Sequence, residues 1–452
     1  MTAGDLSERL EVGRQIAAIT TAFMLPLSTS GQAIAVSIFV VLAILTMDGG
    51  RFSGTIRQPA AYLPVLLFVL LLFGVFWSIL PLNAAIKWVG PYAKLLLIPL
   101  VMASAFDERT ALRIGYAFLA ACLILLVLSW ASLLWHGGPW FWFKSQGVPV
   151  KDNAVQSECF ALCAFGLALT AIKLRKDGEH WRAAAVFVLA ALFFTDIFMI
   201  YLSKTGMLVT LILLVLFAER TGGWRRVPLV VIPALVIIAV AMWVSPPAQT
   251  RLAEMNVDIG GLNGQKETLS TASRLDFWSK AATFVREAPI LGHGTGSIRP
   301  LYQSMEATRP SPYGEAVADP HNQFLHTVLQ VGMIGGILLI AMWLSHFRLF
   351  LDDSIVSSLG LAVVLQNILG SLFNSHLSQV TQGMMYCLAV GLLGALILQK
   401  RTLPHGAERQ SGWRPLLDLH IPRQQPLRDG ARKNFVGAIS DVDDPQVVPR
   451  MD

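Results

Sequence analysis

Apolar runs long enough to cross a membrane follow one another along most of this chain. A transmembrane helix needs about 20 mostly apolar residues, and twelve stretches reach or approach that length. They lie at about 14–28, 31–47, 60–80, 88–105, 111–135, 154–173, 182–201, 204–219, 226–245, 323–346, 354–374 and 379–399. The pattern predicts an all-α polytopic membrane protein with about twelve transmembrane helices. One large polar loop, 246–322, separates the ninth and tenth and is expected to contain short helices.

Composition and charge agree with this prediction and orient the chain. Only 14% of its 452 residues are charged, against about 25% in a soluble domain. Lys and Arg gather in one set of loops, which includes Arg51, Arg109, Arg175 and Arg225. These loops are expected to face the cytoplasm, which puts both termini inside and the large loop outside.

The predicted organisation has four parts. Residues 1–245 hold helices one to nine, 246–322 the external loop, and 323–400 helices ten to twelve. Residues 401–452 are rich in Pro, Arg, Gln and Asp without an apolar period, so we expect a disordered cytoplasmic tail.

Several function classes find no support in the residues. The net charge of +6 reflects loops and tail, which suits anionic lipid better than nucleic acid. All four cysteines lie in apolar runs, so neither a disulfide framework nor a thiolate metal site is predicted. The external side shows no D-x-D pair and no Cys/His cluster. We therefore expect neither metal nor cofactor.

The first polar feature of the loop is a helix that starts near Ser273. Ser273 and Asp276 resemble a capping box. The apolar positions recur at spacings of three and four, namely Leu275, Trp278, Ala282 and Val285. Arg274 then lies in the first turn, where free N–H groups and a guanidinium suit a phosphate. The alternative is that Arg274 only pairs with Asp276 or Glu306.

The sequence Gly292-His293-Gly294-Thr295-Gly296 follows this helix. No Gly-Lys-Ser/Thr comes after it, so it is not a Walker loop. It also lies outside any strand–helix unit. The prediction is a tight turn.

The string Asp319-Pro320-His321-Asn322 predicts the start of the tenth helix, with Asp319 as N-cap and Pro320 in the first position. His321 would lie in the first turn. The positive helix end disfavours an imidazolium there, leaving a neutral ring that accepts a proton. The alternative is a polar interface residue. His326, deeper on another face, is the lesser candidate.

Three lysines complete the predicted site. Lys94 lies inside the fourth span, so it is either functional or snorkels to the interface. Lys204 lies in Ser203-Lys204-Thr205-Gly206, at the external break between spans seven and eight, whereas Lys87 is expected to be a solvated loop charge. Asp196, inside span seven, needs a partner, for which Lys94 is a candidate. Cations without a metal suit a polyanionic leaving group such as a lipid pyrophosphate.

The motif resembles that of the O-antigen ligase family, whose relatives are the O-antigen polymerases and the bacterial protein O-oligosaccharyltransferases. The resemblance lies in Ser273-Arg274…Trp278…Pro289…Gly292-His293-Gly294, then His321-Asn322…Gly332…Gly335, and in the long loop before the late helices. It implies a glycan donor carried on undecaprenyl pyrophosphate at the periplasmic face of the bacterial inner membrane. In the ligases the acceptor is the lipid A–core oligosaccharide.

The resemblance also implies roles. His321 matches the essential histidine and Arg274 the loop arginine. Lys204 stands where members usually carry arginine, which keeps the charge but loses the bidentate fork. We expect an inverting, metal-independent glycosyltransferase with His321 as base and Arg274 on the pyrophosphate. The expected substrate contacts are Lys204, Lys94, Lys87, Asn322, Ser273 and Trp278.

We expect a monomer surrounded by membrane lipids. The alternatives are an O-antigen polymerase, a protein O-oligosaccharyltransferase, a twelve-span transporter and a non-enzymatic scaffold. A single long loop favours the ligase over the polymerase. Transporters place polar groups near the midplane, whereas the candidates of this chain map to the external side.

Overall fold

The computed structural model describes residues 3–104, 106–135, 143, 147–200, 203–246, 249–250, 253, 270–310 and 319–402. Within these ranges the regular elements are helices and no β-strand occurs, which confirms the predicted all-α class. Much of the predicted external loop, including 254–269 and 311–318, lies outside the described residues. So does the predicted tail from residue 403 onward.

The elements are as follows. The first part of the chain contains α1 (Ala3–Leu27), α2 (Thr29–Leu45), α3 (Gly49–Ile56), α4 (Pro59–Phe73), α5 (Leu82–Ala85), the 3-10 turns η1 (Ile86–Trp88) and η2 (Gly90–Leu96), α6 (Leu97–Ala103) and α7 (Glu108–Leu134). The middle contains α8 (Asn153–Lys176), α9 (His180–Met199), α10 (Lys204–Gly222), η4 (Trp224–Arg226) and α11 (Val227–Val244). The last part contains α13 (Ser270–Glu287), α14 (Ile298–Thr308), α15 (Gln323–Leu349), α16 (Ile355–Ser371) and α17 (Val380–Thr402).

Local sequence explains where many of these helices start. A Ser or Asp side chain precedes the first turn and accepts a backbone N–H from it, as at Ser28 before α2, Asp107 before α7, Asp152 before α8 and Ser203 before α10. Such caps satisfy N–H groups that have no partner inside the helix.

A helix lies at each of the twelve predicted spans. Among the described residues, seven helices are long and apolar enough to cross a membrane, or up to nine if each of two bent helix pairs is one span. Two more, α4 and α16, are apolar but shorter. The chain is thus a polytopic membrane protein by composition and helix length, and the count of twelve stays a prediction.

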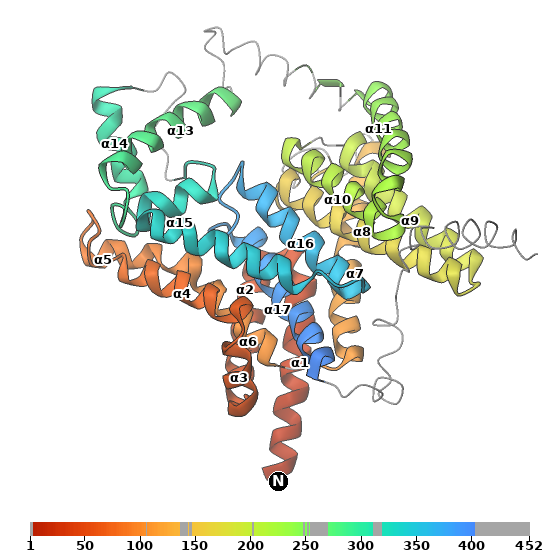
Figure 1. Cartoon of the computed structure of the whole chain (residues 1–452). Helices are drawn as coiled ribbons and strands as arrows, with labels where there is room; N and C mark the ends of the chain where they lie inside the picture. The colour runs from red at the N-terminus through yellow and green to blue at the C-terminus, as the bar shows by residue number, and fades with distance from the viewer. Residues whose placement is uncertain are drawn as a thin grey trace, which may run out of the picture.

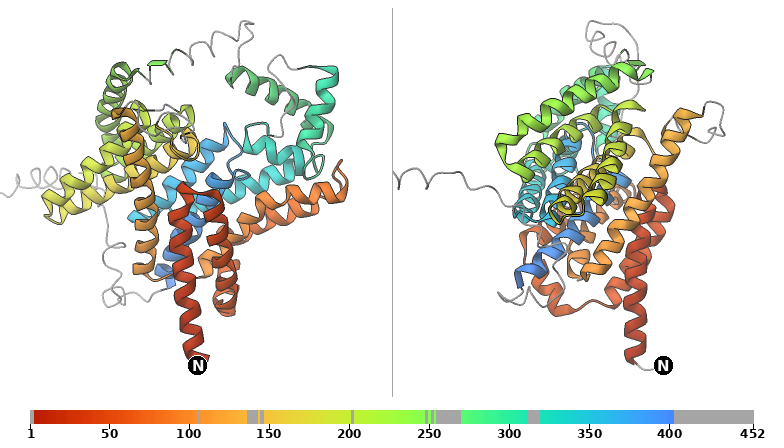
Figure 2. Two further views of the ribbon diagram at one scale, coloured as in Figure 1. Left: turned by 180° about the vertical axis from the view of Figure 1, so that it is seen from behind. Right: turned by 90° about the vertical axis from the view of Figure 1, so that its right-hand side faces the viewer.

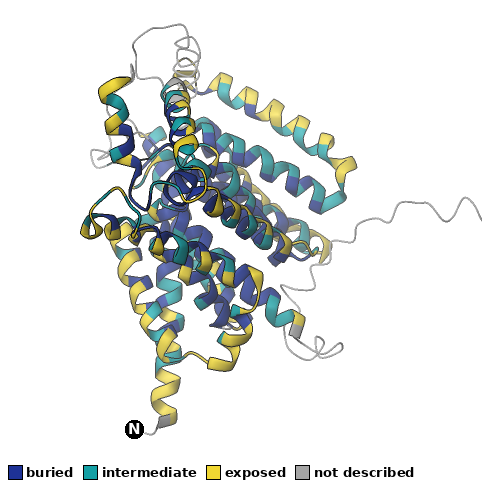
Figure 3. Cartoon of the chain, turned by 60° about the vertical axis from the view of Figure 1, so that its left-hand side comes forward, coloured by how far each residue is buried: buried dark blue, intermediate teal, exposed yellow. Residues whose placement is uncertain are grey.

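Most of the helices pack around one large apolar core. Helix α15 lies along α4, α8 along α9 and α17 along α6 (Figure 1). Helix α11 lies at the edge and contacts α9 and α10 (Figures 1 and 2). The most deeply buried segments belong to the central helices, whereas the start of α1 and much of α3 are exposed (Figure 3).

Candidate functional site

Helix α13 differs from its prediction in start and in face. It is helical from Ser270, so Ser273 is not its cap and Arg274 lies in the second turn. The predicted apolar face is confirmed in part: Trp278 and Val285 pack against the buried cluster, whereas Leu275 and Ala282 are exposed. The buried stripe consists of Phe277, Ala281 and Phe284. The apolar face is therefore rotated from the predicted one, so that the two phenylalanines lie at its centre.

Helices α13 and α14 form a small core on top of α15 (Figure 1). The hydroxyl of Tyr302 on α14 donates to the carbonyl of Phe277 at 2.7 Å, and Leu329 of α15 closes the cluster. Burial raises the pKa of the Tyr302 phenol. This core fixes α13 against the helix that follows His321.

A buried lysine that the sequence analysis missed joins the two loop helices. Lys280 is 1% exposed, and its Nζ lies 2.9 Å from Asp276 Oδ2 and 3.1 Å from Glu306 Oε2. These are the two carboxylates proposed as alternative partners of Arg274. The only sequence signal was the four-residue spacing between Asp276 and Lys280.

The glycine turn after α13 covers a break in α15. Val331 and Gly332 are non-helical, with φ +65° at Gly332, so the carbonyls before them lack helical partners. The N–H groups of His293 and Gly294 donate to the carbonyls of Leu329 and Gln330 at 2.9 and 2.8 Å. The turn therefore has a structural role, because it binds the carbonyls that the break in α15 leaves without helical partners. This agrees with the predicted tight turn.

The same turn ties α15 to α4. Thr295 N donates to Gly74 O at 2.9 Å, and Ser78 Oγ donates to Thr295 O at 2.8 Å. A Cβ at Gly294 would lie 2.1 Å from Ser78 Cα. No side chain fits where the two backbones approach so closely, so glycine is needed there.

The helix start at His321 also corrects the prediction. Helix α15 begins at Gln323 with Asn322 as its cap, whose side chain accepts Leu325 N at 3.0 Å. Asp319 instead accepts the N–H of His321 at 2.9 Å. His321 thus precedes the helix and has φ +53°. A left-handed conformation is uncommon for a residue other than glycine and is frequent at functional sites.

Helix α13 rests on the segment that carries His321. The rings of Phe277 and His321 stack with centroids 6.3 Å apart, and Trp278 Nε1 donates to Pro320 O at 3.1 Å. Arg274 lies one turn earlier on the same helix, about 5 Å of rise from Phe277. The structure therefore brings the helix of Arg274 onto the backbone of His321.

A residue outside the predicted set orients the imidazole. Asn374, between α16 and α17, has its Oδ1 3.4 Å from His321 Nδ1. An amide oxygen accepts a hydrogen bond from the protonated Nδ1, so the lone pair of the neutral ring lies on Nε2. Within the described residues Nε2 of His321 makes no hydrogen bond. That nitrogen suits a base.

The predicted lysines lie in different surroundings. Lys94 is buried in η2, and its Nζ donates to Gln379 O at 2.5 Å and also contacts Ser378 O, so it does not pair with Asp196. Lys204 is half-buried at the start of α10, behind the Ser203 cap. Lys87 is exposed. The half-buried Ser273 lies on α13 beside Arg274.

His326 belongs to a buried network rather than to the surface. Its Nδ1 lies 2.6 Å from the hydroxyl of Tyr92 and 3.0 Å from Nε2 of Gln330. Gln330 Oε1 in turn accepts Gly296 N at 2.9 Å. The network links η2, α15 and the glycine turn.

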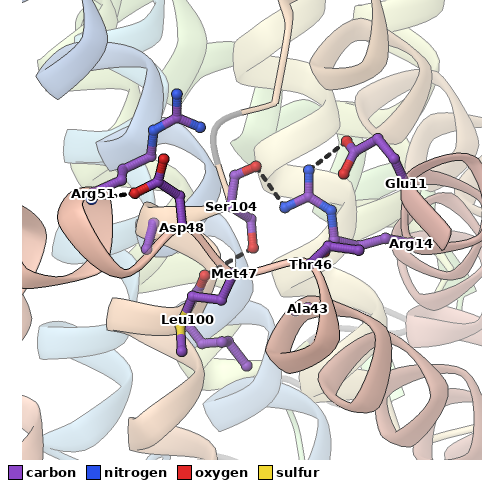
Figure 4. A pocket seen from close by; sticks show the side chains of 10 residues that line it. Glu11, Arg14, Ala43, Thr46, Met47, Asp48, Arg51, Leu100 and Ser104 are labelled. Carbon is purple, nitrogen blue, oxygen red and sulfur yellow. Dashed lines mark hydrogen bonds and ion pairs between the residues drawn. The ribbon is translucent and has the colours of Figure 1, made fainter. Parts of the chain in front are cut away.

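Two cavities lie at opposite predicted sides of the membrane. One, of about 490 Å³, opens where α2, α8 and α17 begin, and there Lys151 Nζ donates to Thr381 Oγ1 at 2.7 Å. The other, of about 150 Å³, lies among the predicted cytoplasmic helix ends around Arg14, whose guanidinium contacts Glu11 and Ser104 (Figure 4). The second cavity is therefore separate from the candidate site.

Comparison with protein families gives one match. Residues 183–340 match the model described as O-antigen ligase. The match runs from α9 into α15 and includes Lys204, Arg274 and His321. It confirms the resemblance drawn from the motif. The comparison with curated proteins found no match.

Proposed function

We propose that this chain, which its residues 183–340 assign to the O-antigen ligase family, transfers glycan from undecaprenyl pyrophosphate to a lipid A–core acceptor. The reaction takes place at the periplasmic face of the bacterial inner membrane. The observation that carries the proposal is the seating of α13 on the His321 segment, through Phe277 and Trp278. This contact supports the proposal because the helix that carries Arg274, the candidate phosphate ligand, packs against the segment that carries His321, the candidate base.

The reaction is a direct displacement with inversion. His321 Nε2 takes the proton of an acceptor sugar hydroxyl, and that oxygen bonds to the anomeric carbon of the donor. The bond from this carbon to the pyrophosphate oxygen breaks, and undecaprenyl pyrophosphate leaves with the electron pair. General base catalysis contributes about 10²–10⁴-fold.

Arg274 supplies the charge that the departing pyrophosphate needs, with Lys204 as a second cation. A guanidinium binds phosphate oxygens through two parallel hydrogen bonds, whereas an ammonium acts as a point charge. Such cations stabilise the oxygens that gain charge as the bond breaks, without a metal. Trp278 and Asn322 hold the site together, since both make backbone contacts around His321.

Deletion of the gene tests the proposal in cells. For a ligase, lipopolysaccharide loses all polymeric glycan while the lipid-linked polymer accumulates. A single glycan repeat on the core would show a polymerase instead. Unchanged lipopolysaccharide, with glycan missing from a protein, would show an oligosaccharyltransferase.

A further inference from the structure

The short segment between α16 and α17, residues 372–379, makes hydrogen bonds to several residues of the candidate site. We call it the connector. It lies outside the family match, which ends at residue 340. Asn322 Nδ2 donates to its Leu372 O at 3.1 Å, and its Leu377 N donates to Gln323 Oε1 at 2.9 Å. Lys94 Nζ binds its carbonyl at Gln379.

Two neighbouring residues of the connector set the conformation of His321. Asn374 Oδ1 faces the imidazole Nδ1 at 3.4 Å. Ser375 Oγ donates to Asp319 Oδ1, the same oxygen that accepts the N–H of His321. The left-handed backbone of His321 thus depends on Asp319, and Asp319 is held by the connector.

The next residue anchors the connector in the helix bundle. His376 Nε2 lies 3.3 Å from Glu158 Oε1 of α8, and the two side chains are 1% and 0% exposed. Within the described residues these carboxylate oxygens and this nitrogen have no other partner. Burial lowers the pKa of His376 to about 4, so its ring is neutral at pH 7.

The pair cannot touch a substrate. The space beside it measures about 10 Å³, which holds about one water molecule and no sugar. The ring of His376 also packs directly on the end of α16, where a Cβ on Gly370 would lie 1.7 Å from Cε1. Because the packing is this close, a shift of the His376 ring would move the connector rather than be taken up by empty space.

We propose that Glu158 and His376 are positioning residues that act on catalysis through the connector and His321. The inference rests on the proposed function, because it assigns these residues to the same base. Loss of the pair lets Asn374 and Ser375 shift, and a shift of about 1 Å in a catalytic group costs about 10²-fold in rate.

The test uses purified full-length protein in lipid nanodiscs, with undecaprenyl-pyrophosphate-linked glycan as donor and lipid A–core as acceptor. Release of undecaprenyl pyrophosphate is measured. Glu158→Leu is expected to lower kcat about 100-fold with KM nearly unchanged. Glu158→Gln, which keeps a hydrogen-bonding group of the same length, is expected to stay within a few-fold of wild type. Equal kcat values for these two variants would overturn the proposal.

A glycine pair provides a test that leaves Glu158 and His376 in place. Gly370→Ala pushes on the His376 ring, whereas Gly360→Ala, on the same helix, meets the Phe350 ring at 2.4 Å, away from the connector. Gly370→Ala is expected to lower kcat about 10-fold or more. Gly360→Ala is expected to leave kcat unchanged for the folded fraction. If Gly370→Ala and Gly360→Ala have equal kcat values per folded molecule, the proposal is contradicted.

A double-mutant cycle separates positioning from general destabilisation. If Glu158 acts through His321, Glu158→Leu has little further effect in a His321→Ala background, whereas independent effects multiply. Multiplied losses would overturn the positioning role. A wild-type rate for His321→Ala would instead remove the base and so refute the proposed function. A slow His321→Ala beside a fast Glu158→Leu would refute the positioning role alone.

Discussion

Substitution of Lys280 by methionine tests how the loop helices are held over the site. The change keeps the long apolar stem but removes the ammonium from between Asp276 and Glu306. Loss of one partner of a buried ion pair costs about 3–5 kcal/mol. The two carboxylate side chains are 11% and 26% exposed, so water relieves part of this cost. We expect a loss of about 2–3 kcal/mol in the local stability of α13 and α14.

Hydrogen exchange followed by mass spectrometry measures this local stability in nanodiscs. Since 1.4 kcal/mol corresponds to a factor of ten, the amides of α13 and α14 should exchange about 30–150-fold faster in Lys280→Met. The triple variant Lys280→Met, Asp276→Asn, Glu306→Gln removes all three charges and should recover most of the protection. Arg182→Met, which breaks an exposed pair with Glu179, should change nothing measurable. Wild-type exchange in Lys280→Met would refute the reasoning.

Three further results are expected. Arg274→Lys should lose much more transfer activity than Lys204→Arg, because only the former discards a bidentate fork; equal losses would contradict the assignment of the pyrophosphate to Arg274. Transfer by the purified protein should survive excess EDTA, and strict metal dependence would refute the role of the cations. Burial raises the pKa of Asp352, but hydrogen bonds from Ser357 and Ser354 outweigh this and leave it below its usual value. Asp352→Asn should therefore lower the unfolding temperature at pH 7. The difference from wild type should begin to shrink as the pH falls below about 4, the ordinary pKa of an aspartate, and should vanish only below the lower pKa of the folded protein. A difference that persists at low pH would contradict this.

The helical class was predictable because apolar runs of this length have few other structures available. Segments such as α8, α15 and α17 appear close to their predicted positions. Helix starts were less predictable. Asp319 and Asn322 are both good caps by residue type. In the structure Asn322 caps α15, whereas the Asp319 carboxylate accepts hydrogen bonds from the N–H of His321 and from Ser375, which is far away in sequence.

The candidate site was predictable only where its residues belong to a local sequence motif. His321 and Trp278 belong to a motif, and in the structure Trp278 binds the carbonyl of Pro320, the residue before His321. The connector carries no motif, although polar Asn374-Ser375-His376 between two apolar helices was a signal. Lys94 was expected near a leaving group, and it binds connector carbonyls instead. Such tertiary partners are set by the packing of distant helices, which local pattern does not encode.

The central claim is that His321 removes the proton of the attacking hydroxyl beside the cation of Arg274. Single-turnover glycan transfer by purified His321→Ala, with donor binding measured on the same sample, tests it most directly. If His321 is the base, the rate should be about 10²–10⁴-fold below wild type with donor binding retained. A wild-type rate in this variant would contradict the claim.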